Sequence, residues 1–282
     1  MYELNVIKST INIGIEKPIK FLHITDTHIA LDDPEKISGR AAGCFEGDEE
    51  GKTIELLKMA LAYAKENNLP IVHTGDLIDF FSRATFNVVD ELFTKDIDYI
   101  YAAGNHDFCH FVGEAREDYE YKWEKINDIA PHIKSNLYFD SKIIGGVNFV
   151  SLDDSYYQIT MGQIESLKAE VAKGYPIVLC MHVPIYSPNL AQAAIPEWCP
   201  NVSFLMGVPE KVLSKYPEDR RIQQTPDETT KKAIDYIKNE PLIKALITGH
   251  NHINHEEEII KDKMQFTTHG TFAGFVREIT VI

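Results

Sequence analysis

Five short apolar runs in this chain each end in aspartate, asparagine or histidine, and this arrangement constrains the fold more than any other feature of the sequence. Each run is rich in β-branched or aromatic residues, which is typical of a buried β-strand. Helical patterns separate the first runs, and such alternation predicts an α/β sheet with parallel strand pairs. The five polar clusters are Asp26 with His28, Asp76, Asn105 with His106, His182, and His250 with His252.

The spacing of apolar residues predicts the remaining elements. Residues 2–15 are expected to form a hairpin or an edge strand, Gly145-Gly146 a tight turn, and Thr160 a helix cap. Three short antiparallel strands are expected over 257–282, and a surface loop over 32–51. The other expected strands are 19–25, 70–74, 97–102, 137–139, 143–144, 147–152, 176–181 and 242–248, and the expected helices are 52–67, 86–93, 161–172 and 229–238.

The residue types in the five clusters are those of a metal site. In open α/β sheets, ligands bind beyond the carboxyl ends of the strands, so clusters far apart in sequence are expected to converge in space. Carboxylate, imidazole and amide oxygen suit manganese, iron or zinc, and the lack of cysteine in the set argues against a structural zinc site. The two aspartates and four histidines are too many ligands for one ion, whereas a carboxylate that bridges two ions resolves the count.

Length, charge and cysteine content narrow the functional classes. The 282 residues can form one large domain or two small ones, and the net charge of −15 disfavours general affinity for nucleic acid. A phosphate substrate is still compatible with this charge, because bound metal ions reverse the local field. We expect a cytoplasmic protein without membrane contact, since the chain lacks a signal peptide and any apolar run of roughly 20 residues. Its cysteines, Cys44, Cys109, Cys180 and Cys199, are then expected to be reduced thiols.

The stretch 183–226 holds seven of the 13 prolines of the chain. An irregular loop of this length is uncommon in a compact domain, and it is usually a functional lid or disordered. Its apolar residues, among them Ile195, Trp198 and Phe204, argue against disorder. We therefore expect a single domain over residues 1–282 with an ordered lid or cap inserted at about 183–226.

Taken in order, the five clusters resemble the signature of the calcineurin-like metallophosphoesterases. Each piece alone is common, but five pieces in the right order, each at the end of a strand, are a specific signal. The resemblance implies a four-layer αββα sandwich of mixed sheets with two metal ions at its edge. It spans residues 20–255, and its pieces are Asp26-Thr27-His28, Gly75-Asp76, Gly104-Asn105-His106-Asp107, the single His182 after a strand, and Gly249-His250-Asn251-His252.

The same resemblance implies a role for each site residue. Asp76 is expected to bridge two divalent or trivalent ions (manganese, iron or zinc), which supply a metal-activated hydroxide as the nucleophile. His106 is expected to contact the phosphate and to protonate the leaving alkoxide, and Asp107 is expected to orient its imidazole. The ligands implied for the first ion are Asp26, His28, Asp76 and His252, and those for the second are Asp76, Asn105, His182 and His250.

Residues near these motifs have plainer structural interpretations. The run Leu77-Ile78-Asp79-Phe80-Phe81 departs from the Asp-Arg-Gly run of the protein serine/threonine phosphatase branch, which disfavours that branch. Arg220 and Arg221 lie beside acidic residues, which favours a solvated patch over a phosphate clamp. His110 is a candidate to face the site, whereas His23, His73 and His269 are expected to be satisfied structural residues.

Four functions can use such a set of residues. A phosphodiesterase of the small-molecule or cyclic-nucleotide branch is favoured by His182-Val183-Pro184 and by the compact spacing of the motifs. A phosphomonoesterase or nucleotide phosphatase would use the same centre, and more positive groups in the lid would favour its dianionic substrate. A nuclease needs a basic track, against which the charge of −15 argues. A non-enzymatic scaffold is disfavoured, because every ligand position and His106 are present. We therefore expect a small phosphate ester as the substrate.

Overall fold

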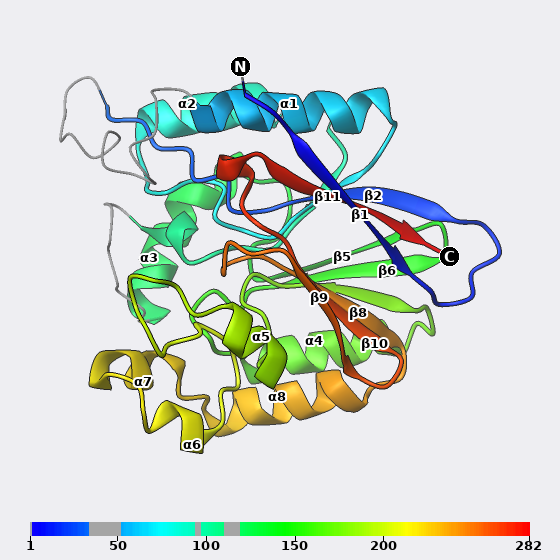
Figure 1. Ribbon diagram of the computed structural model, residues 1–282. Coiled ribbons are helices and arrows are strands. Elements are labelled where there is room, and N and C mark those ends of the chain that lie inside the picture. The colour runs from blue at the N-terminus through cyan, green and yellow to red at the C-terminus, as the bar shows by residue number, and fades with distance from the viewer. Residues whose placement is uncertain (1, 34–51, 94–96, 110–118) are drawn as a thin grey trace.

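The computed structural model describes residues 2–33, 52–93, 97–109 and 119–282. Within this part of the chain, two mixed β-sheets pack face to face, and helices cover the outer face of each sheet (Figure 1). Helices α1 (Lys52–Glu66) and α2 (Arg83–Leu92) lie along the top of the figure, and α4 (Met161–Val171) and α8 (Glu228–Asn239) along the bottom. The expected four-layer sandwich is confirmed. Cys44, His110 and most of the loop expected over 32–51 lie outside the described residues.

The five-stranded sheet has the order β1-β11-β2-β3-β4. Strands β2, β3 and β4 run parallel, and β1 is an edge strand, as expected. Strand β11 lies between β1 and β2, so the expectation of three antiparallel strands over 257–282 is wrong for the last of them. β11 is central because it is hydrogen-bonded along both edges, parallel to β1 and antiparallel to β2, and most of its residues are buried. The strands are β1 (Asn5–Ile11), β11 (Phe275–Val281), β2 (Ile19–Ile24), β3 (Ile71–His73) and β4 (Tyr99–Tyr101).

The six-stranded sheet has the order β5-β6-β7-β8-β10-β9. Strands β5 and β6 form a hairpin through Gly145 and Gly146, whose φ angles of +55° and +85° suit glycine, so the expected turn is confirmed. The three strand-like runs over 137–152 merge into these two strands. Strands β6, β7, β8 and β10 run parallel. The strands are β5 (Phe139–Ile144), β6 (Val147–Leu152), β7 (Ile177–Cys180), β8 (Ile243–Thr248), β10 (Lys263–Thr267) and β9 (His255–Ile260).

Alternation along the strands separates the apolar layers. In β2, Phe21 packs between the two sheets, whereas Leu22 and Ile24 pack toward α1 and α2. In β7, Val178 lies between the sheets, and Leu179 faces the opposite helical layer. Because both faces of these strands are buried, a shift in the register of a strand would misplace its apolar side chains. The strand ends, and the polar residues that follow them, are therefore held in fixed positions.

Helices α1, α4 and α8 match the expected ranges to within one residue, whereas α2 begins at Arg83, earlier than expected. The stretch 183–226 was expected to be irregular, but it contains three short helices. Thr160 caps α4 through a capping box with Gln163, so this expectation is confirmed. Helix α3 (Tyr119–Ile129) was not predicted, because its apolar pattern is weak and Trp123 stays 53% exposed. Short 3-10 helices complete the described elements: η2 (His106–Phe108), η3 (Ala130–His132) and η4 (Thr271–Ala273).

Residues 183–226 contain α5 (Pro188–Ala193), α6 (Glu210–Leu213) and α7 (Glu218–Gln224), which lie at the lower left of Figure 1. The segment packs on the outer helical layer, where buried Leu213 shares an apolar cluster with Ile237 of α8. That this segment acts as a lid remains a prediction.

Cys109, Cys180 and Cys199 are free thiols. Among the helices of the described residues, none has the length and apolar character needed to span a bilayer.

Candidate metal centre

Every residue predicted for the site lies in the segment that follows a strand, and His106 and Asp107 lie there in the 3-10 helix η2. Asp26 and His28 follow β2, Asp76 follows β3, and Asn105 and His106 follow β4 in the first sheet. His182 follows β7, and His250 and His252 follow β8 in the second sheet. Because these strands are parallel, their carboxyl ends share one edge of the sandwich. Asp26, His28, Asp76 and His182 are at most 2% exposed.

The backbone at these positions is unusual. Ten non-glycine residues in the described part of the chain have positive φ angles, and half of them belong to the predicted ligand set. This left-handed conformation costs on the order of 1–3 kcal/mol for a residue with a Cβ and is concentrated at functional sites. The five are Asp26 (+48°), His28 (+51°), Asp76 (+53°), His250 (+68°) and His252 (+50°).

Glycines allow the loops to approach one another. A Cβ on Gly75, whose φ is +90°, would lie 2.3 Å from the backbone nitrogen of Gly104. A Cβ on Gly249 would lie 2.3 Å from Oδ2 of Asp26, which accepts a hydrogen bond from the backbone N–H of His250 at 3.0 Å. Gly75 is therefore required by the approach of the Gly104 backbone, and Gly249 by the approach of the Asp26 side chain.

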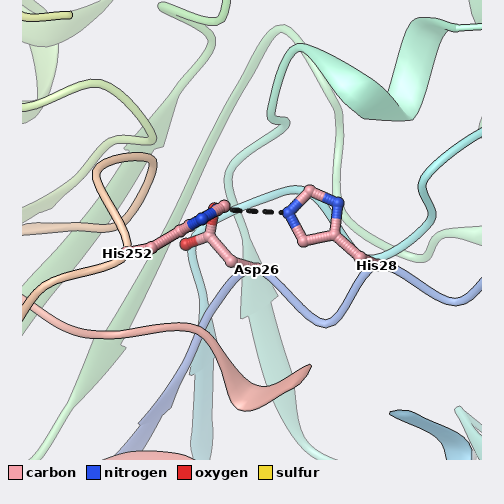
Figure 2. A group of neighbouring side chains, drawn as sticks. All are labelled: Asp26, His28 and His252. Carbon is pink, nitrogen blue, oxygen red and sulfur yellow. Dashed lines mark hydrogen bonds and ion pairs between the residues drawn. The ribbon is translucent and has the colours of Figure 1, made fainter. Parts of the chain in front are cut away.

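Asp26, His28 and His252 form the first group of donors, in which one ligand atom from each residue lies within 4.8 Å of the others. Figure 2 shows the His28 and His252 rings pointing toward each other beside the Asp26 carboxylate. Their Nε2 atoms are 3.3 Å apart, and Nε2 of His252 lies 3.2 Å from Oδ1 of Asp26. One donor atom of each side chain is therefore close enough to the others for all three to bind the same ion.

Asp76, His182 and His250 form the second group. Nε2 of His182 lies 3.2 Å from Oδ2 of Asp76 and 3.1 Å from Nδ1 of His250. The amide oxygen of Asn105 is 3.2 Å from the same His182 nitrogen. The predicted ligands of the second ion are therefore adjacent in the structure.

Asp76 lies between the two groups. Its Oδ1 accepts the backbone N–H of His106 at 2.8 Å, which leaves Oδ2 to face the histidines. This oxygen is 3.2 Å from Nε2 of His182 and 3.8 Å from Nε2 of His28. A single carboxylate oxygen is thus placed to serve both groups.

Each of these imidazole rings is oriented by a hydrogen bond of its other nitrogen. Nδ1 of His28 lies 3.1 Å from Oδ1 of Asp79, and Nδ1 of His182 lies 2.6 Å from the carbonyl oxygen of Thr74. Both partners are acceptors, so these nitrogens carry hydrogen and the Nε2 atoms turn toward the donor groups. Nε2 of His250 contacts the Tyr157 hydroxyl at 2.7 Å, which leaves Nδ1 facing His182.

The imidazole of His106 has a different partner from the one expected. Its Nδ1 lies 3.0 Å from Oδ1 of Asp79, the same oxygen that contacts His28. The expectation that Asp107 orients this ring is therefore wrong. The Asp107 carboxylate instead accepts backbone N–H groups of Gly104 (2.8 Å) and Leu77 (3.0 Å) and the hydroxyl of Tyr101 (2.6 Å). The Asp107 carboxylate thus joins the turn after β4, through Gly104, to the loop after β3, through Leu77.

The contacts of Asp107 give a stability prediction. Asp107→Asn places an amide donor against buried N–H donors, so we expect the free energy of unfolding to fall by about 2–4 kcal/mol. Urea unfolding followed by circular dichroism measures this change. Tyr101→Phe, which removes one donor only, is expected to cost about 1 kcal/mol. An unchanged urea midpoint for Asp107→Asn would contradict this role.

The electrostatics of the site favour cations. Burial raises the pKa of Asp26, but hydrogen bonds from His252 and His28 outweigh it and hold that pKa well below the usual range. Burial lowers the pKa of His28 and His182, but the neighbouring carboxylates outweigh it and raise both pKa values to about 10. The same field would favour divalent ions, which displace protons from their ligands on binding. The donor set of oxygen and imidazole nitrogen therefore fits two metal ions.

Three residues at the site were missed by the sequence analysis: Asp79, Asp154 and Tyr157. Asp154 accepts the backbone N–H groups of His182 and Val183 at 2.8 and 3.0 Å, and burial raises its pKa to about 7. It follows β6 just as the other clusters follow their strands, so the rule used for five strands would have found it. Asp79 and Tyr157 carry no such signal, because each lies in the interior of a loop, beyond the polar residue that follows its strand.

Other residues named from the sequence have structural contacts. His23 and His73 are fully buried and hydrogen-bonded, so both are satisfied core residues as expected. Arg220 pairs with the exposed Asp219 and with Gln223, in agreement with a solvated patch. Phe80 is buried beside Cys109, and His269 stacks on Phe275 with ring centroids 4.7 Å apart.

Comparison with known proteins agrees with this geometry. A family model described as calcineurin-like phosphoesterase matches residues 19–254. A dimetal phosphatase from Danio rerio superposes with a TM-score of 0.57 at 13% identity, covering 90% of this chain and 88% of that one. GAP50, an anchor in the inner membrane complex of Plasmodium, gives 0.49 at 14% identity over 89% and 71% of the two chains. A 5′-nucleotidase from Candida albicans gives 0.45 at 14% identity over 93% of this chain but 47% of its own length. The curated proteins contain no significant match.

Proposed function

Because this chain belongs to the calcineurin-like phosphoesterase family, and is therefore a phosphoester hydrolase, we propose that it hydrolyses a small phosphodiester with the help of two metal ions. One observation carries the proposal. Oδ2 of Asp76 faces both groups of donors, at 3.2 Å from His182 and 3.8 Å from His28. A shared carboxylate oxygen is what a pair of ions needs as a bridge.

We propose the following ligands. The first ion takes Asp26, His28, Asp76 and His252, and the second takes Asp76, Asn105, His182 and His250. Manganese, iron and zinc all suit this mixture of oxygen and nitrogen donors. When bound, such ions lower the pKa of water toward neutrality and neutralise charge on the phosphoryl oxygens.

The chain itself supplies proton transfer and orientation. His106 is held through Nδ1 by Asp79, and its ring is 25% exposed, so Nε2 can reach a substrate. We propose that this nitrogen protonates the leaving alkoxide. Asp79 keeps the hydrogen on Nδ1 of both His28 and His106, which fixes the orientation of a ligand and of the proton donor together.

The charge of the surroundings supports a diester substrate. Among the described residues, every ion pair of Asp26, Asp76 and Asp79 is with a histidine, and none is with lysine or arginine. A phosphate monoester carries close to two negative charges at neutral pH, whereas a diester carries one. The monoester would therefore benefit more from a lysine or arginine beside the centre, and within the described residues none of these three carboxylates holds one.

Two nitrophenyl esters test this preference. With added manganese, we expect kcat/KM for bis-p-nitrophenyl phosphate to exceed that for p-nitrophenyl phosphate by at least about 10-fold. Dialysis against a chelator should abolish both reactions, and manganese should restore them. The opposite preference would make the protein a phosphomonoesterase or nucleotide phosphatase. Turnover that survives complete metal removal would overturn the proposed function.

We also propose that residues 183–226 form a lid beside this centre. The side chain of Asn251, which stands between the two ligands His250 and His252, donates to the carbonyl oxygens of Ser203 (2.9 Å) and Phe204 (3.3 Å). A shift of this segment would therefore move the loop that carries both histidines.

A further inference from the structure

A line of buried polar side chains crosses the space between the two sheets. Nε of Arg277 donates to Oγ1 of Thr268 at 2.9 Å, and this oxygen lies 2.9 Å from Nδ1 of His23. Nε2 of His23 lies 2.8 Å from Oγ1 of Thr74. All four residues are at most 2% exposed, in a layer that is otherwise filled with apolar side chains. Such a network is costly unless its members satisfy one another.

The outer end of this line joins strands of both sheets. The guanidinium of Arg277, in β11, donates to the hydroxyl of Ser9 in β1 at 2.6 Å. It also donates to the carbonyl oxygen of Thr267 in β10 at 3.1 Å and to Glu256 in β9 at 3.0 Å. A planar group with several donors therefore fixes the spacing between the sheets at this point.

The charge of Arg277 determines which atoms carry hydrogen in this series of hydrogen bonds. The Thr268 oxygen accepts a hydrogen bond from Arg277. Burial lowers the pKa of His23 well below its usual value, and the charge of Arg277 lowers it further. The buried Thr268 hydroxyl must then donate to Nδ1 of His23. The neutral ring carries its hydrogen on Nε2 and donates it to Thr74.

The inner end of the line reaches the donor groups. The carbonyl oxygen of Thr74 accepts the hydrogen of Nδ1 of His182 at 2.6 Å. It also lies 3.4 Å from the Thr25 hydroxyl, which donates to Oδ2 of Asp26 at 2.7 Å. Thr74 thus contacts the predicted ligand His182 directly and is linked to Asp26 through the Thr25 hydroxyl.

We propose that Arg277, Thr268 and His23 are positioning residues that hold the two halves of the donor set in register. One half (Asp26, His28, Asp76, Asn105) belongs to the five-stranded sheet, and the other (His182, His250, His252) belongs to the six-stranded sheet. The line of contacts, hereafter the inter-sheet relay, sets the distance between these halves and the orientation of the His182 ring. The inference rests on the proposed function, since it assigns the relay to that centre.

Thr268→Val tests the inter-sheet relay, because it removes the central hydroxyl with little change in shape. We expect kcat for bis-p-nitrophenyl phosphate to fall by about 10-fold with KM nearly unchanged, the lower end of the effect of losing a direct partner of a metal ligand, because Thr268 acts on His182 only through His23 and Thr74. The affinity of the metal-free protein for Co²⁺, followed by its visible absorption, should weaken by at least about 10-fold. Arg277→Met should act similarly, and the double variant should be little worse than either single one.

Thr230→Val is the matched control. Thr230 is equally buried and its hydroxyl also has two partners, Gln158 and the N–H of Ile159, but it lies on α8 away from the relay. We expect it to lower the midpoint of thermal unfolding without changing Co²⁺ affinity or kcat. If Thr268→Val does not fold, His23→Gln and His23→Leu provide the comparison. Gln keeps a donor toward Thr74, so it should retain more Co²⁺ affinity and more activity than Leu.

The outcomes separate the two proposals. If the wild-type protein binds Co²⁺ and hydrolyses the diester, but Thr268→Val behaves as Thr230→Val does, the relay has only a structural role and this inference is overturned. Equal losses for His23→Gln and His23→Leu would overturn it as well. If the wild-type protein neither binds Co²⁺ nor hydrolyses either ester, the proposed function fails, and this inference fails with it.

Discussion

Asp76→Asn is expected to lower kcat/KM for bis-p-nitrophenyl phosphate by at least about 10³-fold and to remove at least one bound metal ion. Oδ2 of Asp76 is the oxygen that faces His182 at 3.2 Å and His28 at 3.8 Å. The asparagine oxygen can still accept the backbone N–H of His106, so the fold should persist. Its amide group, however, presents hydrogens where the bridging oxygen stood. Elemental analysis after desalting, together with initial rates, measures both effects.

The control for this change is Asp90→Asn. Asp90 is a half-exposed carboxylate that pairs with His132 on the surface, so its replacement removes the same charge away from the centre. We expect unaltered metal content and rates for this variant. Two tightly bound ions and near-normal turnover in Asp76→Asn would refute a bridging role for Asp76.

His106→Asn is expected to have an effect that depends on the leaving group. For an alkyl ester, whose alkoxide needs a proton, kcat should fall by about 10³-fold, within the range for loss of a general acid. For a nitrophenyl ester, whose leaving group is stable as an anion, we expect a loss of only about 10-fold. Rates for a series of methyl aryl and dialkyl phosphates, plotted against leaving-group basicity, measure the difference as a steeper slope.

Asp79→Asn distinguishes orientation from proton transfer. Because Asp79 contacts Nδ1 of both His106 and His28, we expect a loss of about 10–100-fold that also grows with leaving-group basicity. His132→Asn, which changes a partly exposed histidine outside the site, is the control.

An equal loss for all leaving groups in His106→Asn would mean that His106 binds the phosphate and does not donate the proton.

Much of the site could be predicted because its signals are local. A buried strand followed at once by Asp26, Asp76 or His182 can be recognised from the pattern of apolar residues alone. The order of these clusters along the chain then indicates the family. The same local logic predicted the cap at Thr160, the turn at Gly145-Gly146 and the apolar strands of both sheets.

The partners of these residues could not be predicted in the same way. Asp107 follows His106 directly, so adjacency suggested a pair, yet the turn after β4 directs its carboxylate to backbone N–H groups. Asp79 contacts His106 only because the loops after β3 and β4 meet in space. Strand β11 was misplaced for a similar reason. Its apolar pattern predicts a strand but does not indicate which sheet the strand will join.

The sequence by itself therefore determined which residues stand at the strand ends, the types of ligand they offer and the family to which they belong. Only the tertiary structure decided that Asp76 presents one oxygen to both donor groups and that Asp79 orients His106. It also decided that Arg277 and His23 join the sheets behind the centre. The physical reason is the distance along the chain over which each kind of information is encoded. Hydrophobic periodicity is encoded within a few residues, whereas hydrogen-bond partners are chosen among groups that become neighbours only when the sheets pack.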